Sequence, residues 1–208
     1  MLINLTTIPT VYINMDRRVD LRERMESMFS RLGFTNTHRS PGVVVPDEPV
    51  CVGIAYAFKN AFDLAQTVSG GGPFLMLEDD VVPRSSFSAN IEVPDDFDAV
   101  YLGISSWGLM DGIPGPYTSV TYLSDTIARV HTMLSGHAIL YAGSDRTYTK
   151  TVHGLMDVAA KAKTYQDIEF AKTMPHHNVY AFVDPLFFQT SSTEPTNLKL
   201  TDFAPRRR

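Results

Sequence analysis

Three consecutive carboxylates follow a short apolar run near the middle of the sequence. The run is Phe74–Leu77, and it leads directly into Glu78, Asp79 and Asp80. Adjacent acids repel one another unless a cation or hydrogen-bond donors compensate their charge. Hard oxygen ligands of this kind suit Mg²⁺ or Mn²⁺, especially where a substrate diphosphate supplies further oxygens. A solvated acidic turn is the alternative, but the preceding apolar strand favours a metal site because open α/β sheets bind ligands at the carboxyl ends of their strands.

A second polar cluster, Asn14 to Arg18, closes an earlier apolar segment and leads into an amphipathic stretch. Free amides at a helix start and the forked donors of paired arginines both suit phosphate or the polar edge of a nucleotide. A surface turn that caps a helix is the alternative. The cluster alone does not separate the two interpretations.

The first half of the chain alternates between strand and helix patterns. Residues 9–15 are β-branched and aromatic, as in a buried strand, and residues 20–32 carry apolar side chains at helical spacing up to Gly33. A second helix is indicated from Ile54 to Ala65, followed by a glycine-rich breaker and the strand at 74–77. Parallel neighbours need a covering helix between them, so this order predicts a Rossmann-like α/β arrangement.

The second half is predicted to be mixed. Strands are expected at 97–102, 117–123, 127–130 and 137–141, helices between 144 and 174, and a last strand around 179–188 that Pro185 interrupts. The loop at 105–116 is rich in glycine and proline and is a candidate lid. No repeat or linker divides the chain, so we expect a single domain over residues 1–208.

Composition excludes several classes of protein. The chain has 208 residues, 44% of them hydrophobic and 20% charged, which is ordinary for one globular domain. A net charge of −5 disfavours nucleic acid as a partner. The single cysteine, Cys51, and the lack of a signal peptide or an apolar run long enough to span a bilayer favour the cytoplasm, or a host cytoplasm for a viral protein.

Two motifs together resemble glycosyltransferase family 25, which includes lipopolysaccharide-modifying enzymes and collagen galactosyltransferases. The family opens with roughly Ile-Asn-Leu-Asp-Arg-Arg, and this chain reads Ile-Asn-Met-Asp-Arg-Arg at 13–18. Its central Leu-Glu-Asp-Asp motif is matched in full at 77–80, with weaker similarity at 100–103 and 165–169. The family's Gly-Cys-x-x-Ser-His is absent, because Ala55 and Tyr56 stand where the serine and histidine belong. A distant or viral-type branch of the same broad fold fits these residues as well.

The resemblance implies a single-domain GT-A fold, which is α/β and Rossmann-like, with a mostly parallel central sheet and a smaller mixed β portion in the second half. Residues 9–105 would form the nucleotide-sugar and metal-binding half, 106–190 the acceptor side, and 191–208 a tail. The implied reaction moves a hexose, with inversion, from a nucleotide-diphosphate sugar such as a UDP-sugar to a hydroxyl acceptor. That acceptor would be a glycan, a protein or a lipid-linked glycoconjugate.

The resemblance also assigns roles to residues. Asp80 would ligate Mn²⁺ or Mg²⁺, Glu78 would contact the metal, its water or the ribose, and Asp79 would position either one. The nucleotide would lie beside Asn14, Asp16, Arg17 and Arg18, with Lys59 as an addition from the second predicted helix.

The late part of the chain would supply the proton acceptor that an inverting transfer needs. Asp167 and Glu169 are the candidates, and Asp167 is favoured because it is nearer the predicted helix start, where the family places its late acid. Two residues apart on a helix, they point in different directions, so only one would serve. His177 would complete the metal sphere or, alternatively, belong to a polar turn.

Two rival functions remain open at this stage. Adjacent acids after a strand also serve metal-dependent phosphohydrolases and nucleotidyltransferases. The missing serine and histidine make a non-catalytic nucleotide-sugar-binding module of the same fold a second alternative.

Overall fold

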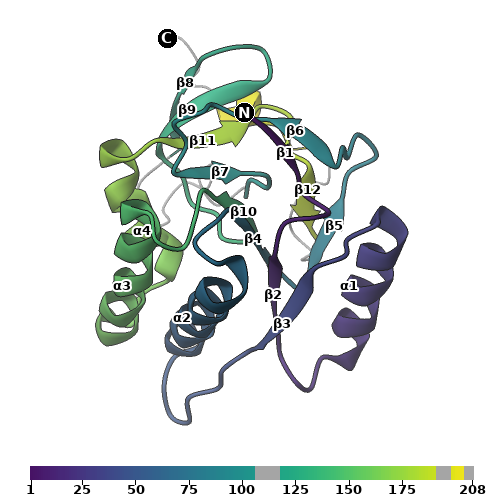
Figure 1. The fold of residues 1–208 in the computed structure, drawn as a ribbon. Helices are drawn as coiled ribbons and strands as arrows, with labels where there is room; N and C mark the ends of the chain where they lie inside the picture. Colours follow the sequence, from purple (N-terminus) through teal and green to yellow (C-terminus); the bar gives the residue numbers. More distant parts are fainter. Residues whose placement is uncertain (106–117, 191–197, 204–208) are drawn as a thin grey trace.

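An eight-stranded mixed sheet forms the centre of the protein, which is described here by a computed structural model (Figure 1). The structure describes residues 1–105, 118–190 and 198–203. The strands are ordered β3-β2-β4-β10-β7-β11-β9-β8. Their bounds are β2 Thr10–Asn14, β3 Thr37–Pro41, β4 Phe74–Glu78, β7 Ala99–Tyr101, β8 Ser119–Tyr122, β9 Ile127–Thr132, β10 Ala138–Tyr141 and β11 Val179–Phe182. The strand pairings show that β9 and β10 are antiparallel to the other six strands of this sheet.

Helices cover both faces of this sheet. Helix α1 (Val19–Leu32) lies on one face, and α2 (Val50–Ser69), α3 (Thr147–Ala162) and α4 (Gln166–Thr173) lie on the other (Figure 1). Successive residues of a strand point to opposite faces. In β4, Leu75 and Leu77 therefore pack in the core cluster under α1, whereas Phe74 and Met76 pack in the cluster under α2 and α3. Burial on both faces explains why β4 reads as a continuous apolar run.

The parallel arrangement predicted for the first half is confirmed. Strand β2 pairs in parallel with both β3 and β4. Helix α1 ends at Gly33, whose left-handed backbone (φ 80°) suits a residue without a side chain. Strand β3 was not predicted from the sequence, because Thr37–Pro41 lacks the apolar pattern of a buried strand. It is the outermost strand of the sheet and buries only Ser40.

The second half is mixed, as predicted, but its last predicted strand is two strands. Residues Val179–Phe182 form β11 in the main sheet, whereas β12 (Phe187–Gln189) pairs with β5 (Val81–Pro83). The break at Pro185 therefore redirects the chain toward the segment that follows β4. A further small sheet pairs β1 (Leu2–Asn4) with β6 (Asn90–Glu92). The 3₁₀ turns are η2 (Met174–His176) and η3 (Leu200–Phe203).

The candidate lid at 105–116 falls almost entirely outside the described residues. Among the helices that the structure describes, none combines the length and apolar character needed to cross a membrane.

Candidate functional site

A cavity of about 890 Å³ opens at the carboxyl ends of β2, β3 and β4. These three strands are parallel, so the segments that follow them meet at one edge of the sheet. Strand β10 runs antiparallel to β4, which brings its amino end, preceded by Ser135 and Gly136, to the same edge. Residues 164–168, which comprise the end of the α3–α4 connection and the first turn of α4, close another side. We call this end of the sheet, where the strands β2, β3 and β4 finish, the cavity edge, as distinct from an outermost strand.

The acids after β4 lie at this cavity, as their position after an apolar strand predicts. Glu78 and Asp79 line it directly. Asp80 is connected to Glu78 through the side-chain amide of Gln189, whose Nε2 lies 3.3 Å from Glu78 Oε2 and 3.3 Å from Asp80 Oδ1. Within the described ranges, none of the three acids forms an ion pair with a lysine, arginine or histidine. The side-chain donors that the described residues supply to these carboxylates are the neutral amides of Asn14 and Gln189.

Burial and crowding of like charges change the ionisation of these acids. Burial, with smaller contributions from the charges of Asp80, Asp167 and Asp79, raises the pKa of Glu78 to about 8. Burial also raises the pKa of Asp79 and of Asp80 above the usual range, although their amide donors oppose the shift. The ionised forms of these acids are therefore disfavoured in the protein alone, and a bound cation would stabilise them.

Asp167 lies at the same cavity, in the first turn of α4. Burial raises the pKa of its carboxyl group to about 6. A carboxylate with a pKa near neutrality is well suited to accept a proton. Gly136 lies close by, and a Cβ on this residue would be only 3.0 Å from Glu78 Oε1, so a side chain there would press on the acid.

Two residues that sequence analysis missed hold the backbone of the acidic turn. Arg24, on α1, donates from Nη2 to the carbonyl of Asp79 at 3.0 Å and from Nη1 to Thr190 Oγ1 at 3.1 Å. Thr190 in turn donates its backbone N–H and its hydroxyl to the carbonyl of Asp80, each at 3.0 Å. The turn that presents the carboxylates is therefore fixed from two distant elements.

The cluster after β2 is divided by the structure. Arg17 lines the cavity. Asn14 is buried and donates from Nδ2 to Asp79 Oδ2 at 2.7 Å, while its Oδ1 accepts from Arg39 Nε at 3.0 Å. Asp16 and Arg18 belong to the same turn but do not line the cavity.

Those two side chains are engaged in pairs of their own. Asp16 forms an ion pair with Arg39, and Arg18 donates to both carboxylate oxygens of Asp20 at 3.1 Å. Of the residues assigned to the nucleotide, Arg17 therefore has the clearest access, and Asn14 acts through Asp79.

Three other predicted site residues lie away from the acids. Lys59 forms an ion pair with Asp157 on α3 at 2.6 Å, and Glu169 forms one with Lys172 at 2.6 Å. His177 precedes β11, where its Nδ1 is 3.7 Å from a carboxylate oxygen of Asp98. The register of β7, β10 and β4 puts Asp98 beside the start of β4, at the opposite edge of the sheet. The structure does not bring these three side chains to the cavity.

The donor set determines which cations the site could hold. In the part of the chain that the structure describes, no group of three or more His, Cys, Asp or Glu side chains is placed to hold a metal ion. Glu78 and Asp80 share the Gln189 amide and offer hard oxygen atoms. This set fits Mg²⁺ or Mn²⁺ with water and substrate phosphate as the remaining ligands, and does not fit an all-protein metal site.

No family model matches the sequence, and no curated protein matches it. Among solved structures, the chain is similar to a glycosyltransferase involved in glycosylation of the major capsid of PBCV-1, with a TM-score of 0.46 and 10% identity over 90% of this chain and 94% of that one. A Drosophila β1,4-galactosyltransferase 7 mutant in complex with manganese, UDP-Gal and xylobiose has a TM-score of 0.44 and 10% identity, over 97% of this chain and 75% of that one. The inositol-1-phosphate CTP transferase from T. maritima has a TM-score of 0.43 and 16% identity, over 95% and 74%. Similarity at this level does not identify a function, which must be argued from the cavity edge itself.

Proposed function

We propose that this protein is a metal-dependent glycosyltransferase that moves a hexose from a nucleotide-diphosphate sugar to a hydroxyl acceptor. The observation that carries the proposal is a large cavity with half-buried acids on one wall and a further acid, Asp167, on another. The acids of the first wall form no ion pair within the described residues. The first set suits a cation that binds diphosphate, and the second suits proton removal from an acceptor. The sequence resemblance to family 25 is consistent with this assignment.

Each residue has a proposed role. Glu78 and Asp80 would hold Mn²⁺ or Mg²⁺, which when bound supplies positive charge to stabilise a departing diphosphate. Asp79, fixed by Asn14, would orient the nucleotide together with Arg17. Asp167 would accept the proton of the acceptor hydroxyl from the other wall of the cavity. A UDP-sugar donor and a glycan, protein or lipid-linked acceptor complete the proposal.

Product analysis tests the proposed reaction against its rivals. The full chain is incubated with Mn²⁺ and a panel of nucleotide-diphosphate sugars, and the nucleotide and sugar products are separated. Glycosyl transfer releases nucleoside diphosphate and leaves the sugar on the acceptor, whereas slow hydrolysis without an acceptor releases nucleoside diphosphate and free sugar. Release of nucleoside monophosphate with sugar 1-phosphate would instead support a phosphohydrolase. Release of pyrophosphate from a nucleoside triphosphate in a parallel incubation with sugar 1-phosphate would support a nucleotidyltransferase. Binding of a nucleotide sugar without any turnover would support a binding module. The Asp157→Asn variant, altered at an ion pair on α3, serves as the matched control.

A further inference from the structure

The side chain of Gln189 occupies the position between two of the acids. Gln189 ends β12 and lines the cavity. Its Nε2 lies 3.3 Å from Glu78 Oε2, and 3.3 and 3.5 Å from the two carboxylate oxygens of Asp80. The amide nitrogen faces these oxygen atoms and donates to them, since an ionised carboxylate is an acceptor and would repel the amide oxygen. A neutral N–H donor therefore lies where a cation bound by both carboxylates would be placed.

The backbone of Gln189 is fixed, whereas its terminal amide has freedom to rotate. Its backbone pairs with Val81 across the β12–β5 ladder, and the next residue, Thr190, donates its N–H to the Asp80 carbonyl at 3.0 Å. The terminal torsion of a glutamine is broad and roughly two-fold, so turning the amide over exchanges Nε2 and Oε1 with little movement of the rest of the side chain. The same position can thus offer a donor or an acceptor.

An amide oxygen is an ordinary ligand for hard divalent cations. The described residues hold no third acid, histidine or cysteine placed to join Glu78 and Asp80 around a metal ion. We propose that the Gln189 amide bridges Glu78 and Asp80 through Nε2 when no cation is bound, and turns over to ligate the cation through Oε1 when one binds. This inference rests on the proposed function, because it concerns the cation assigned there.

The charge of the proposed ligand set has a consequence. Two carboxylates and a neutral amide balance a divalent cation without an excess of negative charge. A third carboxylate at position 189 would bind the cation alone more tightly, but would add repulsion among the acids when no cation is present. Replacement by an apolar residue would remove both the donor of the cation-free state and the oxygen of the bound state.

Cation binding, measured without any turnover, tests the inference. Free Mn²⁺ is titrated by electron paramagnetic resonance against the full-length wild type, Gln189→Leu, Gln189→Asn, Gln189→Glu and the remote control Gln66→Leu. We expect Gln189→Leu to weaken Mn²⁺ binding by at least about ten-fold. Removing a residue that merely hydrogen-bonds to a metal ligand already lowers metal affinity by about ten-fold or more, so loss of a direct ligand should cost no less. Gln189→Glu should strengthen binding, and Gln66→Leu should match the wild type. Gln189→Asn, whose amide is too short to reach both acids, should bind more weakly and serves if the leucine variant does not fold.

A second readout follows the amide itself. In protein labelled with ¹⁵N-glutamine, the side-chain signal that is missing from Gln189→Leu, or from Gln189→Asn, should shift when diamagnetic Mg²⁺ is added, while the signal of the remote Gln66 keeps its chemical shift. Equal Mn²⁺ affinity in the wild type and the position-189 variants, or an unmoved Gln189 signal at saturating Mg²⁺, would overturn this inference and leave the proposed function intact. Failure of the wild type to bind Mn²⁺ even with UDP present would overturn both.

Discussion

Half-buried acids lie at both ends of the strands of the central sheet, but the side chains that contact them differ in charge. At the edge opposite the cavity, Asp98 accepts the backbone N–H of Asn178 at 2.8 Å and lies 3.7 and 3.8 Å from nitrogen atoms of His177 and Arg146. At the cavity edge, the side-chain donors to Glu78, Asp79 and Asp80 are neutral amides.

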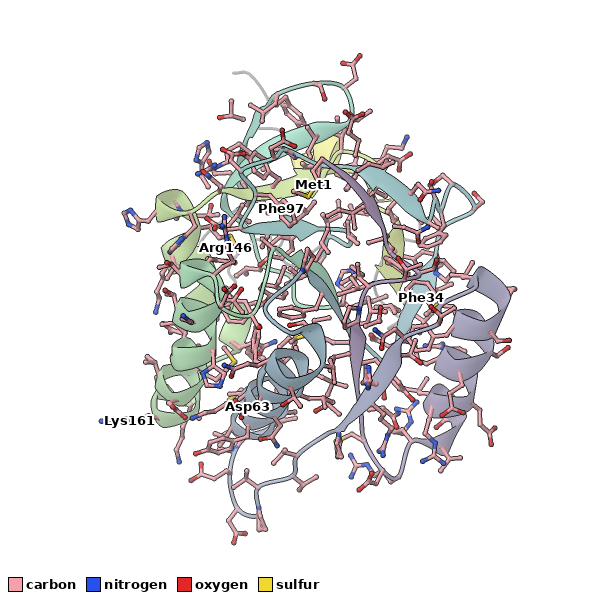
Figure 2. All side chains as sticks on the ribbon, in the orientation of Figure 1. Met1, Phe34, Asp63, Phe97, Arg146 and Lys161 are labelled. Carbon is pink, nitrogen blue, oxygen red and sulfur yellow. The ribbon has the colours of Figure 1, made fainter. Side chains whose placement is uncertain are left out.

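Helix α3 connects the two environments. Its flanking residue Arg146 lies near one edge, while Lys161 lies in its last turn, just before the residues that line the cavity (Figure 2). Burying an acid without a charged partner costs stability, so such acids are retained where a ligand needs them. The partners of an acid, more than the acid itself, therefore distinguish a structural acid from a candidate ligand-binding acid.

The largest effect is expected from removing an acid at the cavity edge. Asp80→Ala should abolish the Mn²⁺-dependent part of the thermal shift that a nucleotide sugar produces. It should also reduce the turnover rate by about 100-fold or more, as loss of an electrostatic stabiliser does. Thermal melts with and without Mn²⁺ and a product assay measure both effects. An unchanged Mn²⁺-dependent shift would show that Asp80 does not hold the cation.

Asp167 should give the next largest effect, and a pH dependence. Asp167→Asn should lower kcat by about 100- to 10,000-fold, the usual contribution of a general base. Because the base must be deprotonated and burial raises the pKa of Asp167 to about 6, the wild-type rate should rise with pH through this value. The residual activity of the variant should lack this rise. A pH–rate profile with the same limb in both proteins would assign the proton transfer elsewhere.

The raised pKa of Asp167 also predicts a stability effect. The folded value of about 6 exceeds the ordinary 3.8, so the folded chain binds the proton more tightly, and ionised Asp167 reduces stability as pH rises from about 4 through 6. Asp167→Asn should therefore melt at a higher temperature than the wild type at pH 8, and the gain should disappear below pH of about 4. A lower melting temperature for the variant at pH 8 would contradict this interpretation.

At the opposite edge, a change should affect stability and leave chemistry intact. Asp98→Asn keeps the shape of the side chain but weakens its interactions with the Asn178 N–H, His177 and Arg146. We expect a loss of about 1–3 kcal/mol in the free energy of unfolding, measured by urea denaturation. The rate per folded molecule and the Mn²⁺ affinity should match the wild type. A selective loss of cation binding would remove the contrast between the edges.

The smallest effect is expected at Lys59. Its ion pair with Asp157 is partly exposed, so Lys59→Met should change the free energy of unfolding by about 1 kcal/mol or less. Nucleotide-sugar affinity, measured by calorimetry, should not change, because Lys59 does not line the cavity. Weaker nucleotide-sugar binding by this variant would show that Lys59 contributes to the donor site after all.

The sequence by itself determined the local features of this protein. Apolar runs and helical spacing specify β2, β4, α1 and α2, and the position of Glu78 to Asp80 after a buried strand places the acids at a ligand-binding edge. These features depend on neighbours in the chain, which periodicity records. Strand β3 could not be predicted, because a polar edge strand of Thr37–Pro41 has no such pattern.

Only the tertiary structure decided which other residues join the acids. Gln189 reaches Glu78 across 111 positions of sequence, and Arg24 reaches Asp79 across 55. Strand pairing and helix packing create these contacts, and no local pattern records them. The family resemblance favoured Asp167 over Glu169, but only the fold shows that Asp167 lines the cavity while Glu169 pairs with Lys172. The identity of an acid is local, whereas its solvation and partners depend on the whole fold.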